Sequence, residues 1–286
     1  MRHRIFVSLC LGSAVALSAC SQETTDAEVE RAIDAVNVID ESNLNDVMLQ
    51  SADPEEAVNY FVRATTEQPD RVDLQRGLAL ALVRAKRPRE AAQAWERLVS
   101  MPDSTPEDRI GYADALIRNG DWDKAEAQLD KIPPTYETFS RYRLEAMVAD
   151  SNQEWQKADS FYEIAVGLTT RPANVLNNWG YSKLSRGEFG EAEQLFGEAL
   201  TYDPNLFTAK NNLVLARGAQ RKYDLPILPM SQTERAQLLH TLALSAIKQG
   251  DVSTGKALLN DAIETHPQHF DAAVRSLEAL EGNVRG

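Results

Sequence analysis

Small and large apolar residues recur along this chain at helical spacing, in cycles of close to 34 residues. Each cycle has a small residue, a large apolar residue four positions later and a further apolar residue seven positions later. The small residues are Ala57, Ala91, Ala125, Ala158, Ala192 and Gly255, at spacings of 34, 34, 33, 34 and 63. Positions i, i+4 and i+7 share one face of an α-helix, so each cycle predicts an amphipathic helix with a buried face.

These helices are the second members of helix pairs, and five first helices are also predicted. The mark of a first helix is a large residue beside a small one: Leu78-Ala79, Tyr112-Ala113, Trp179-Gly180, Leu213-Val214 and Leu242-Ala243. Gly120, Gly187 and Gly250 separate the paired helices, and Pro69, Pro204 and Pro267 follow the second ones. This pattern resembles the tetratricopeptide repeat. The resemblance implies an all-α fold, a right-handed α-solenoid of about six repeats plus a capping helix.

The period fails once, after Ala192. A first helix through Asn211 and Asn212 is followed by the sequence Tyr223-Asp224-Leu225-Pro226-Ile227-Leu228-Pro229. Two prolines three residues apart exclude an α-helix, so an extended segment is predicted at 223–232. Its apolar side chains are expected to pack along neighbouring helices; the alternative is an exposed docking strip. The repeats therefore occupy 51–222, and a last repeat with the capping helix occupies 233–286.

The first nineteen residues predict an export signal. Arg2 and Arg4 precede an apolar stretch that is too short to span a bilayer stably. The tetrad Leu17-Ser18-Ala19-Cys20 resembles the lipobox of bacterial lipoproteins, which implies acylation of Cys20; the alternative is ordinary cleavage near Ala19. Cys20 would be the only cysteine left, so no intramolecular disulfide is expected. Residues 20–50 are then the lipidated cysteine with a tether or N-terminal cap.

Charge and the absence of catalytic motifs narrow the function. The formal net charge is −13, and loss of Arg2 and Arg4 with the signal makes it −15. Such a charge repels phosphate backbones, so nucleic acid is not an expected partner. No glycine-rich phosphate loop, nucleophile elbow or zinc-protease motif occurs in the sequence. We expect neither an enzyme nor a metal or cofactor site.

The resemblance implies a partner-binding groove on the first helices of the repeats. The apolar residues that would line it are Leu80, Val83, Ile117, Met147, Tyr181, Leu184, Leu215 and Leu244. Asparagines at Asn177, Asn178, Asn211 and Asn212 join this groove, where Asn178 and Asn212 would hydrogen-bond an extended peptide. The alternative is that neighbouring repeats cover these side chains.

Basic residues fall on the same face, at Arg76, Arg84, Arg118, Arg143 and Lys248. In repeats that clamp a terminal carboxylate, basic residues at these positions hold the peptide. The alternative favoured for Arg84 and Arg118 is a favourable interaction of a cation with the C-terminal end of its own helix.

The layout as a whole resembles the TadD-type lipoproteins of the tight-adherence (Flp pilus) assembly system. The most specific stretches are Tyr142 to Ala146, Asn177 to Tyr181 and Thr233 to Leu244. The resemblance implies a pilotin-like adaptor, lipid-anchored at the periplasmic face of the outer membrane, whose protein partner is a secretin subunit or another pilus assembly component. One rival is a lipoprotein adaptor that regulates cell-wall hydrolases or synthases. Another is an enzyme or transport component with a small ligand in a closed polar pocket.

Overall fold

The computed structural model describes residues 44–284, and within that range the chain is helical without any strand. Residues 1–53 and 54–286 form two units, and the second holds the repeats. Residues 44–50 are helical. The helices of the second unit are α2 (Pro54–Glu67), α3 (Val72–Arg84), α4 (Pro88–Val99), α5 (Pro106–Asn119), α6 (Trp122–Leu129), α7 (Phe139–Ser151), α8 (Trp155–Gly167), α9 (Ala173–Ser185), α10 (Phe189–Tyr202), α11 (Phe207–Ala219), α12 (Gln232–Lys248), α13 (Val252–Thr265) and α14 (Asp271–Val284).

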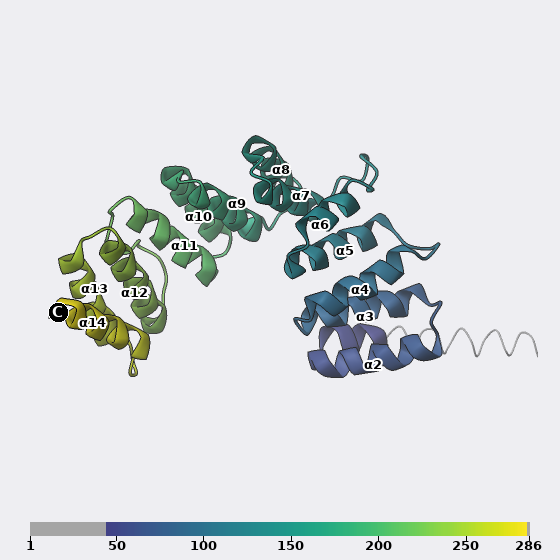
Figure 1. Cartoon of the computed structure of the whole chain (residues 1–286), viewed down its shortest axis with the longest axis horizontal. Coiled ribbons are helices and arrows are strands. Elements are labelled where there is room, and N and C mark those ends of the chain that lie inside the picture. Colours follow the sequence, from purple (N-terminus) through teal and green to yellow (C-terminus); the bar gives the residue numbers. More distant parts are fainter. Residues whose placement is uncertain (1–43, 285–286) are drawn as a thin grey trace, which may run out of the picture. The chain divides into compact units, whose positions relative to one another are not determined.

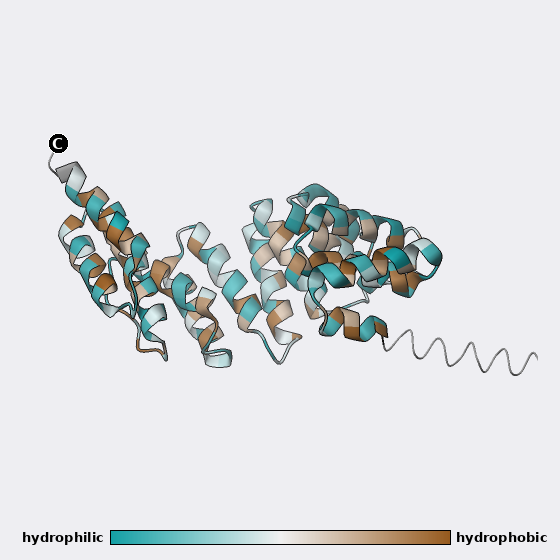
Figure 2. Cartoon of the chain, turned by 90° about the horizontal axis from the view of Figure 1, so that it is seen from below, coloured by the Kyte–Doolittle hydropathy of each residue, from teal (hydrophilic) through white to brown (hydrophobic). Residues whose placement is uncertain are grey.

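These helices follow one another as hairpins (Figure 1). The pairs are α3 with α4, α5 with α6, α7 with α8, α9 with α10, and α12 with α13, while α2 packs on α3 and α14 packs on α13. Hydrophobic and hydrophilic residues alternate along most of them (Figure 2), as expected of helices that bury one face. The predicted all-α repeat fold is confirmed. The predicted signal peptide and Cys20 lie outside the described residues, as does most of the predicted tether.

The residues that define the repeat form the core. All six small residues of the second helices are buried, and so are the large residues four positions later, Phe61, Trp95, Leu129, Tyr162, Phe196 and Leu259. A glycine of a neighbouring first helix faces some of these rings. A Cβ at Gly180 would stand 2.7 Å from the ring of Phe196, too close for real atoms. Close helix approach therefore explains the glycine at this position.

A residue in the left-handed backbone conformation follows the first helix of each hairpin. Gly120, Gly187 and Gly250 have φ values of 85°, 83° and 84°, respectively. Lys86 and Gln153 adopt the same conformation at the equivalent turns, with φ of 58° and 60°. This conformation is uncommon outside glycine, so the turn geometry belongs to the repeat and does not depend on glycine.

The interrupted unit has a non-helical segment at the place of the two prolines. After α11 no second helix forms, and residues 220–231 run without a helix to α12. Tyr223, Leu225 and Met230 pack against the core of α12 and α13, and Leu228 packs against the core of α9, α10 and α11. The prediction that the segment packs along neighbouring helices is thus confirmed for these residues. Ile227, between them, is fully exposed.

Lys210 fastens this segment to the helices on both sides. Its side chain is 2% exposed, and its ammonium donates to the carbonyl of Pro229 at 2.7 Å and to Glu234 Oε1 at 3.0 Å. Glu234 also closes the capping box that begins α12, where it accepts from the backbone N–H of Ser231. A buried ammonium needs such partners, so α11, the segment and the start of α12 form one hydrogen-bonded joint.

Candidate functional site

Two neighbouring pockets open on the first helices of the C-terminal repeats. We call one of them the α9–α12 pocket; its volume is about 730 Å³. It is lined by Leu184, Phe189, Asn211, Leu215, Ala219, Thr241, Leu244, Ser245, Lys248 and Gln249. Half of these side chains are apolar, and Leu244 is 46% exposed, so part of this apolar surface is left in water.

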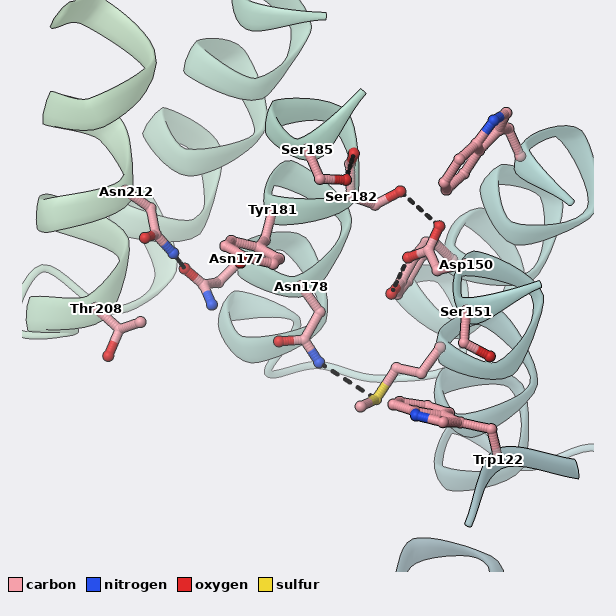
Figure 3. A pocket seen from close by; sticks show the side chains of 13 residues that line it. Trp122, Asp150, Ser151, Asn177, Asn178, Tyr181, Ser182, Ser185, Thr208 and Asn212 are labelled. Atoms are coloured by element: carbon pink, nitrogen blue, oxygen red, sulfur yellow. Dashed lines mark hydrogen bonds between the residues drawn. The ribbon is translucent and has the colours of Figure 1, made fainter. Parts of the chain in front are cut away.

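The other, the α7–α9 pocket, has a volume of about 500 Å³ and a more mixed lining. It is lined by Trp122, Met147, Asp150, Ser151, Trp155, Tyr162, Asn177, Asn178, Tyr181, Ser182, Ser185, Thr208 and Asn212. Tyr181 is 58% exposed. Aromatic rings, carboxamides and one carboxylate therefore share one opening, which Figure 3 shows from close by.

The carboxamides of this pocket retain free hydrogen-bonding groups. Asn212 donates to Asn177 Oδ1 at 3.1 Å, and Asn178 donates only to the sulfur of Met147, at 3.8 Å (Figure 3). Within the described part of the chain, the side-chain oxygens of Asn178 and Asn212 accept no hydrogen bond. An amide offers two donors and an acceptor, so this row can pair with the backbone of an extended peptide.

Asp150 is the carboxylate of the α7–α9 pocket. Ser182 donates to its Oδ1 at 2.6 Å and Tyr162 donates to its Oδ2 at 2.8 Å, so the carboxylate joins α7, α8 and α9 (Figure 3). Burial raises the pKa of Asp150, and these two hydroxyls and the nearby charge of Arg186 offset only part of that effect. In residues 44–284 no basic side chain forms an ion pair with Asp150.

Other partly buried carboxylates of the repeats have cationic partners. Asp159 pairs with Arg186 at 2.5 Å and Lys183 at 3.0 Å, and Glu193 pairs with Arg217 at 2.9 Å and Lys222 at 2.8 Å. Burial raises the pKa of both, but the hydrogen bonds from these partners outweigh burial and bring each pKa below its usual value. Asp150 differs because its donors are neutral.

Ten of the predicted groove residues line these two pockets. Met147, Asn177, Asn178, Tyr181 and Asn212 line the α7–α9 pocket, and Leu184, Asn211, Leu215, Leu244 and Lys248 line the α9–α12 pocket. The other seven line neither of the two pockets: Arg76, Leu80, Val83, Arg84, Ile117, Arg118 and Arg143. Leu80 is 39% exposed and Ile117 is buried. The structure thus gathers the C-terminal part of the predicted row.

Three of the predicted basic residues have aspartate partners inside the chain. Arg76 makes a two-pronged pair with Asp108, at 2.6 and 2.9 Å. Arg118 and Arg143 share Asp114, at 2.5 and 3.3 Å. To bind the terminal carboxylate of a peptide, each of these arginines would first have to break its ion pair with the aspartate. Lys248 lines the α9–α12 pocket and is exposed.

The sequence interpretation missed the contribution of the second helices. Trp122, Trp155 and Phe189 each begin a second helix and line a pocket. They stand three residues before Ala125, Ala158 and Ala192, a register that the sequence displays. Asp150 was also missed. It takes the place that Val83, Ile117 and Leu184 have in the other first helices, so a carboxylate in that apolar register was its signal.

The described residues contain no group of three or more His, Cys, Asp or Glu side chains placed to hold a metal ion. Among the same residues, no helix has the length and apolar character needed to cross a membrane.

Comparison with known proteins identifies the repeat. The tetratricopeptide repeat model matches residues 47–109 and 82–137. Mouse tetratricopeptide repeat protein 21B is 26% identical over 185 residues, which is 58% of this chain and 14% of the mouse protein. This chain thus spans a small part of that relative.

Solved structures share the fold. A tetratricopeptide repeat protein from Parabacteroides merdae matches with a TM-score of 0.57, at 12% identity, over 84% of this chain and 96% of that one. A chain of the APC/C hetero-tetramer Cut9-Hcn1 matches with a TM-score of 0.59, at 15% identity, over 82% of this chain and 48% of that one. Identities this low bear on the fold alone. The repeat model, the internal period and the stacked hairpins together show that this chain folds as an array of tetratricopeptide repeats.

Proposed function

We propose that this chain is a membrane-anchored adaptor that holds a segment of a partner protein along α7, α9, α11 and α12. The observation that carries the proposal is the pair of adjoining pockets on these helices. Their apolar and aromatic side chains include Tyr181 and Leu244, which are 58% and 46% exposed. Exposed apolar residues that gather in a groove are typical of a protein-binding surface.

The carboxamides support an extended partner segment. Asn178 and Asn212 offer side-chain oxygens, and both line the α7–α9 pocket beside Tyr181. An extended backbone presents N–H and C=O groups at regular intervals and can be held by such side chains, while its own side chains enter the pockets. No catalytic role enters this proposal, because the pockets serve to bind.

We further propose that the partner is a secretin subunit of the Flp pilus system. Acylation of Cys20 would place both proteins at the periplasmic face of the outer membrane. Support comes from the resemblance to TadD-type lipoproteins in Tyr142 to Ala146, Asn177 to Tyr181 and Thr233 to Leu244. Two of these stretches include pocket residues: Asn177, Asn178 and Tyr181 in one, and Thr241 and Leu244 in the other.

Charge reversal in the groove tests the proposal. A chain with Tyr181→Glu and Leu244→Glu should lose co-purification of the secretin from detergent-solubilised membranes, and secretin multimers should be depleted from the outer-membrane fraction. The physical reason is that a glutamate cannot be buried against an apolar partner without a large desolvation cost. The measurement is the amount of secretin retained with the tagged chain.

The matched control is Tyr202→Glu with Leu168→Glu. These two residues are 55% and 44% exposed, and they line neither pocket. The control adds the same charges to the same residue types, and it should retain the secretin. Equal retention by both double variants would contradict binding through the groove. Secretin multimers that stay unchanged on deletion of the gene would contradict the pilus role.

A further inference from the structure

Asp150 has a charge that the chain itself does not neutralise. Asp108, Asp159 and Glu193 each pair with an arginine or a lysine, but the two donors to Asp150 are the neutral hydroxyls of Ser182 and Tyr162. The charge of Arg186 acts on Asp150, yet its guanidinium is bound to Asp159 at 2.5 Å. Hydrogen bonds satisfy lone pairs but leave the charge, which is costly in a half-buried place.

Aromatic side chains line the same pocket as this carboxylate. Trp122, Trp155 and Tyr181 line the same pocket as Asp150, together with the sulfur-bearing side chain of Met147. Aromatic faces attract cations, and tryptophan does so most strongly. The protein already uses one of these rings in that way, since the guanidinium of Arg186 lies 5.4 Å from the ring centre of Trp155. Carboxylate and aromatic faces together favour a flat or compact cation.

We propose that the α7–α9 pocket binds a lysine or arginine side chain of the partner segment, with Asp150 as its counter-ion and Trp122, Trp155 and Tyr181 as its walls. This inference rests on the proposed function, because it assumes a protein segment in the groove. It predicts a basic residue beside apolar ones in that segment, since five of the ten side chains that line the neighbouring α9–α12 pocket are apolar.

Other occupants fit less well. An apolar side chain would take water away from Asp150 and put no donor in its place, which is unfavourable. An acidic side chain would meet both Asp150 and a chain with a formal net charge of −13. A cationic one gains a charge-assisted hydrogen bond, which is shorter and stronger than a neutral one.

Peptide selection tests the inference without assuming the identity of the partner. Peptides that bind the detergent-solubilised full-length chain are selected from a displayed library of random short sequences. Each selected peptide is then synthesised in two forms, one with arginine and one with citrulline at its basic position. Citrulline has nearly the same shape as arginine and no charge. We expect the citrulline form to bind the wild-type chain about tenfold more weakly, as loss of a charge-assisted pair implies.

Three variants locate the effect. Asp150→Asn retains the shape of the side chain and should lower the arginine-to-citrulline affinity ratio to the few-fold that the aromatic walls contribute, since the amide has no charge to attract the guanidinium. Glu193→Gln removes the same charge from a carboxylate outside the pocket and should leave the ratio as in the wild type. Trp122→Leu should weaken the arginine peptide several-fold through loss of the cation–π contact. Thermal unfolding shows whether each variant is folded.

The outcomes separate this inference from the proposed function. Selected peptides without basic residues, or an arginine preference unchanged by Asp150→Asn, would overturn the inference. If such peptides still depend on Tyr181 and Leu244, the groove itself stands. A chain that selects no peptide contradicts the adaptor function and this inference together.

Discussion

At the scale of single residues, buried carboxylates connect successive repeats. Asp108 is 1% exposed and accepts both prongs of Arg76 from α3, while it also caps α5 through Thr105. Burial alone would raise the pKa of Asp108, but the hydrogen bonds from Arg76 and Thr105 outweigh it, and the pKa lies below its usual value. The ionised form is therefore part of the folded structure.

Asp108→Asn should lower the free energy of unfolding by about 2 kcal/mol at neutral pH, the usual worth of hydrogen bonds to a charged group. Because the folded-state pKa is lowered, this stabilisation is present above the unfolded pKa, near 4, and is lost as the pH falls through the folded value. Urea unfolding of both chains from pH 7 to below pH 4 measures it.

The control for this variant is Asp103→Asn, an exposed position in the preceding loop, where the change should be within about 0.5 kcal/mol. A difference between wild type and Asp108→Asn that stays constant over the whole pH range would argue against an ionised role for Asp108.

Sequence patterns predicted the buried residues better than the polar ones. Burial follows from size and spacing, so Phe61, Tyr162 and Phe196 were predictable. Which arginine meets which aspartate depends on how the hairpins stack: Arg76 and Asp108 are 32 residues apart. The same reason hid Asp150, whose donors come from two other helices.

At the scale of elements, the interrupted unit shows what proline decides and what it leaves open. The pair Pro226 and Pro229 predicted that no helix forms, and residues 220–231 confirm it. Proline spacing says nothing about which side chains turn inward. That choice follows from the cores on both sides, which bury Tyr223, Leu225 and Leu228 in part and leave Ile227 in water.

Two neighbouring positions of this segment should therefore respond differently to truncation. Leu228→Ala should cost about 2 kcal/mol of unfolding free energy, at the low end for a leucine because the side chain is only partly buried. Ile227→Ala should change it by less than about 0.5 kcal/mol. Urea unfolding of both variants gives the two values.

The two variants serve as controls for each other, since each shortens a large apolar side chain within the same loop. A loss at Ile227 equal to that at Leu228 would mean that the exposed isoleucine packs on something that these contacts do not include.

At the scale of the whole molecule, the adaptor proposal joins an anchor to a groove. We expect the wild-type chain in the membrane fraction and a Cys20→Ser chain in the soluble fraction, because acyl chains contribute about 0.8 kcal/mol for each methylene that enters the bilayer. Fractionation of cells followed by detection of a C-terminal tag measures the partition.

The groove supplies the control for this prediction. The Tyr181→Glu and Leu244→Glu chain should still sediment with the membrane, since its Cys20 is intact. A Cys20→Ser chain that remains with the membrane would contradict lipid anchoring, and one that still supports pilus assembly would show that the anchor is dispensable.

Asp150 also lies at the interface between two hairpins. It belongs to α7, and it accepts hydrogen bonds from hydroxyl groups of α8 and α9. In an array of this kind the total stability is a sum of repeat and neighbour contributions. A cation of the partner that binds Asp150 would increase the free energy of interaction between the two hairpins that meet there. Binding of the partner in the α7–α9 pocket would then enlarge the stretch of chain that unfolds cooperatively. The partner would thus contribute to the stability of the array.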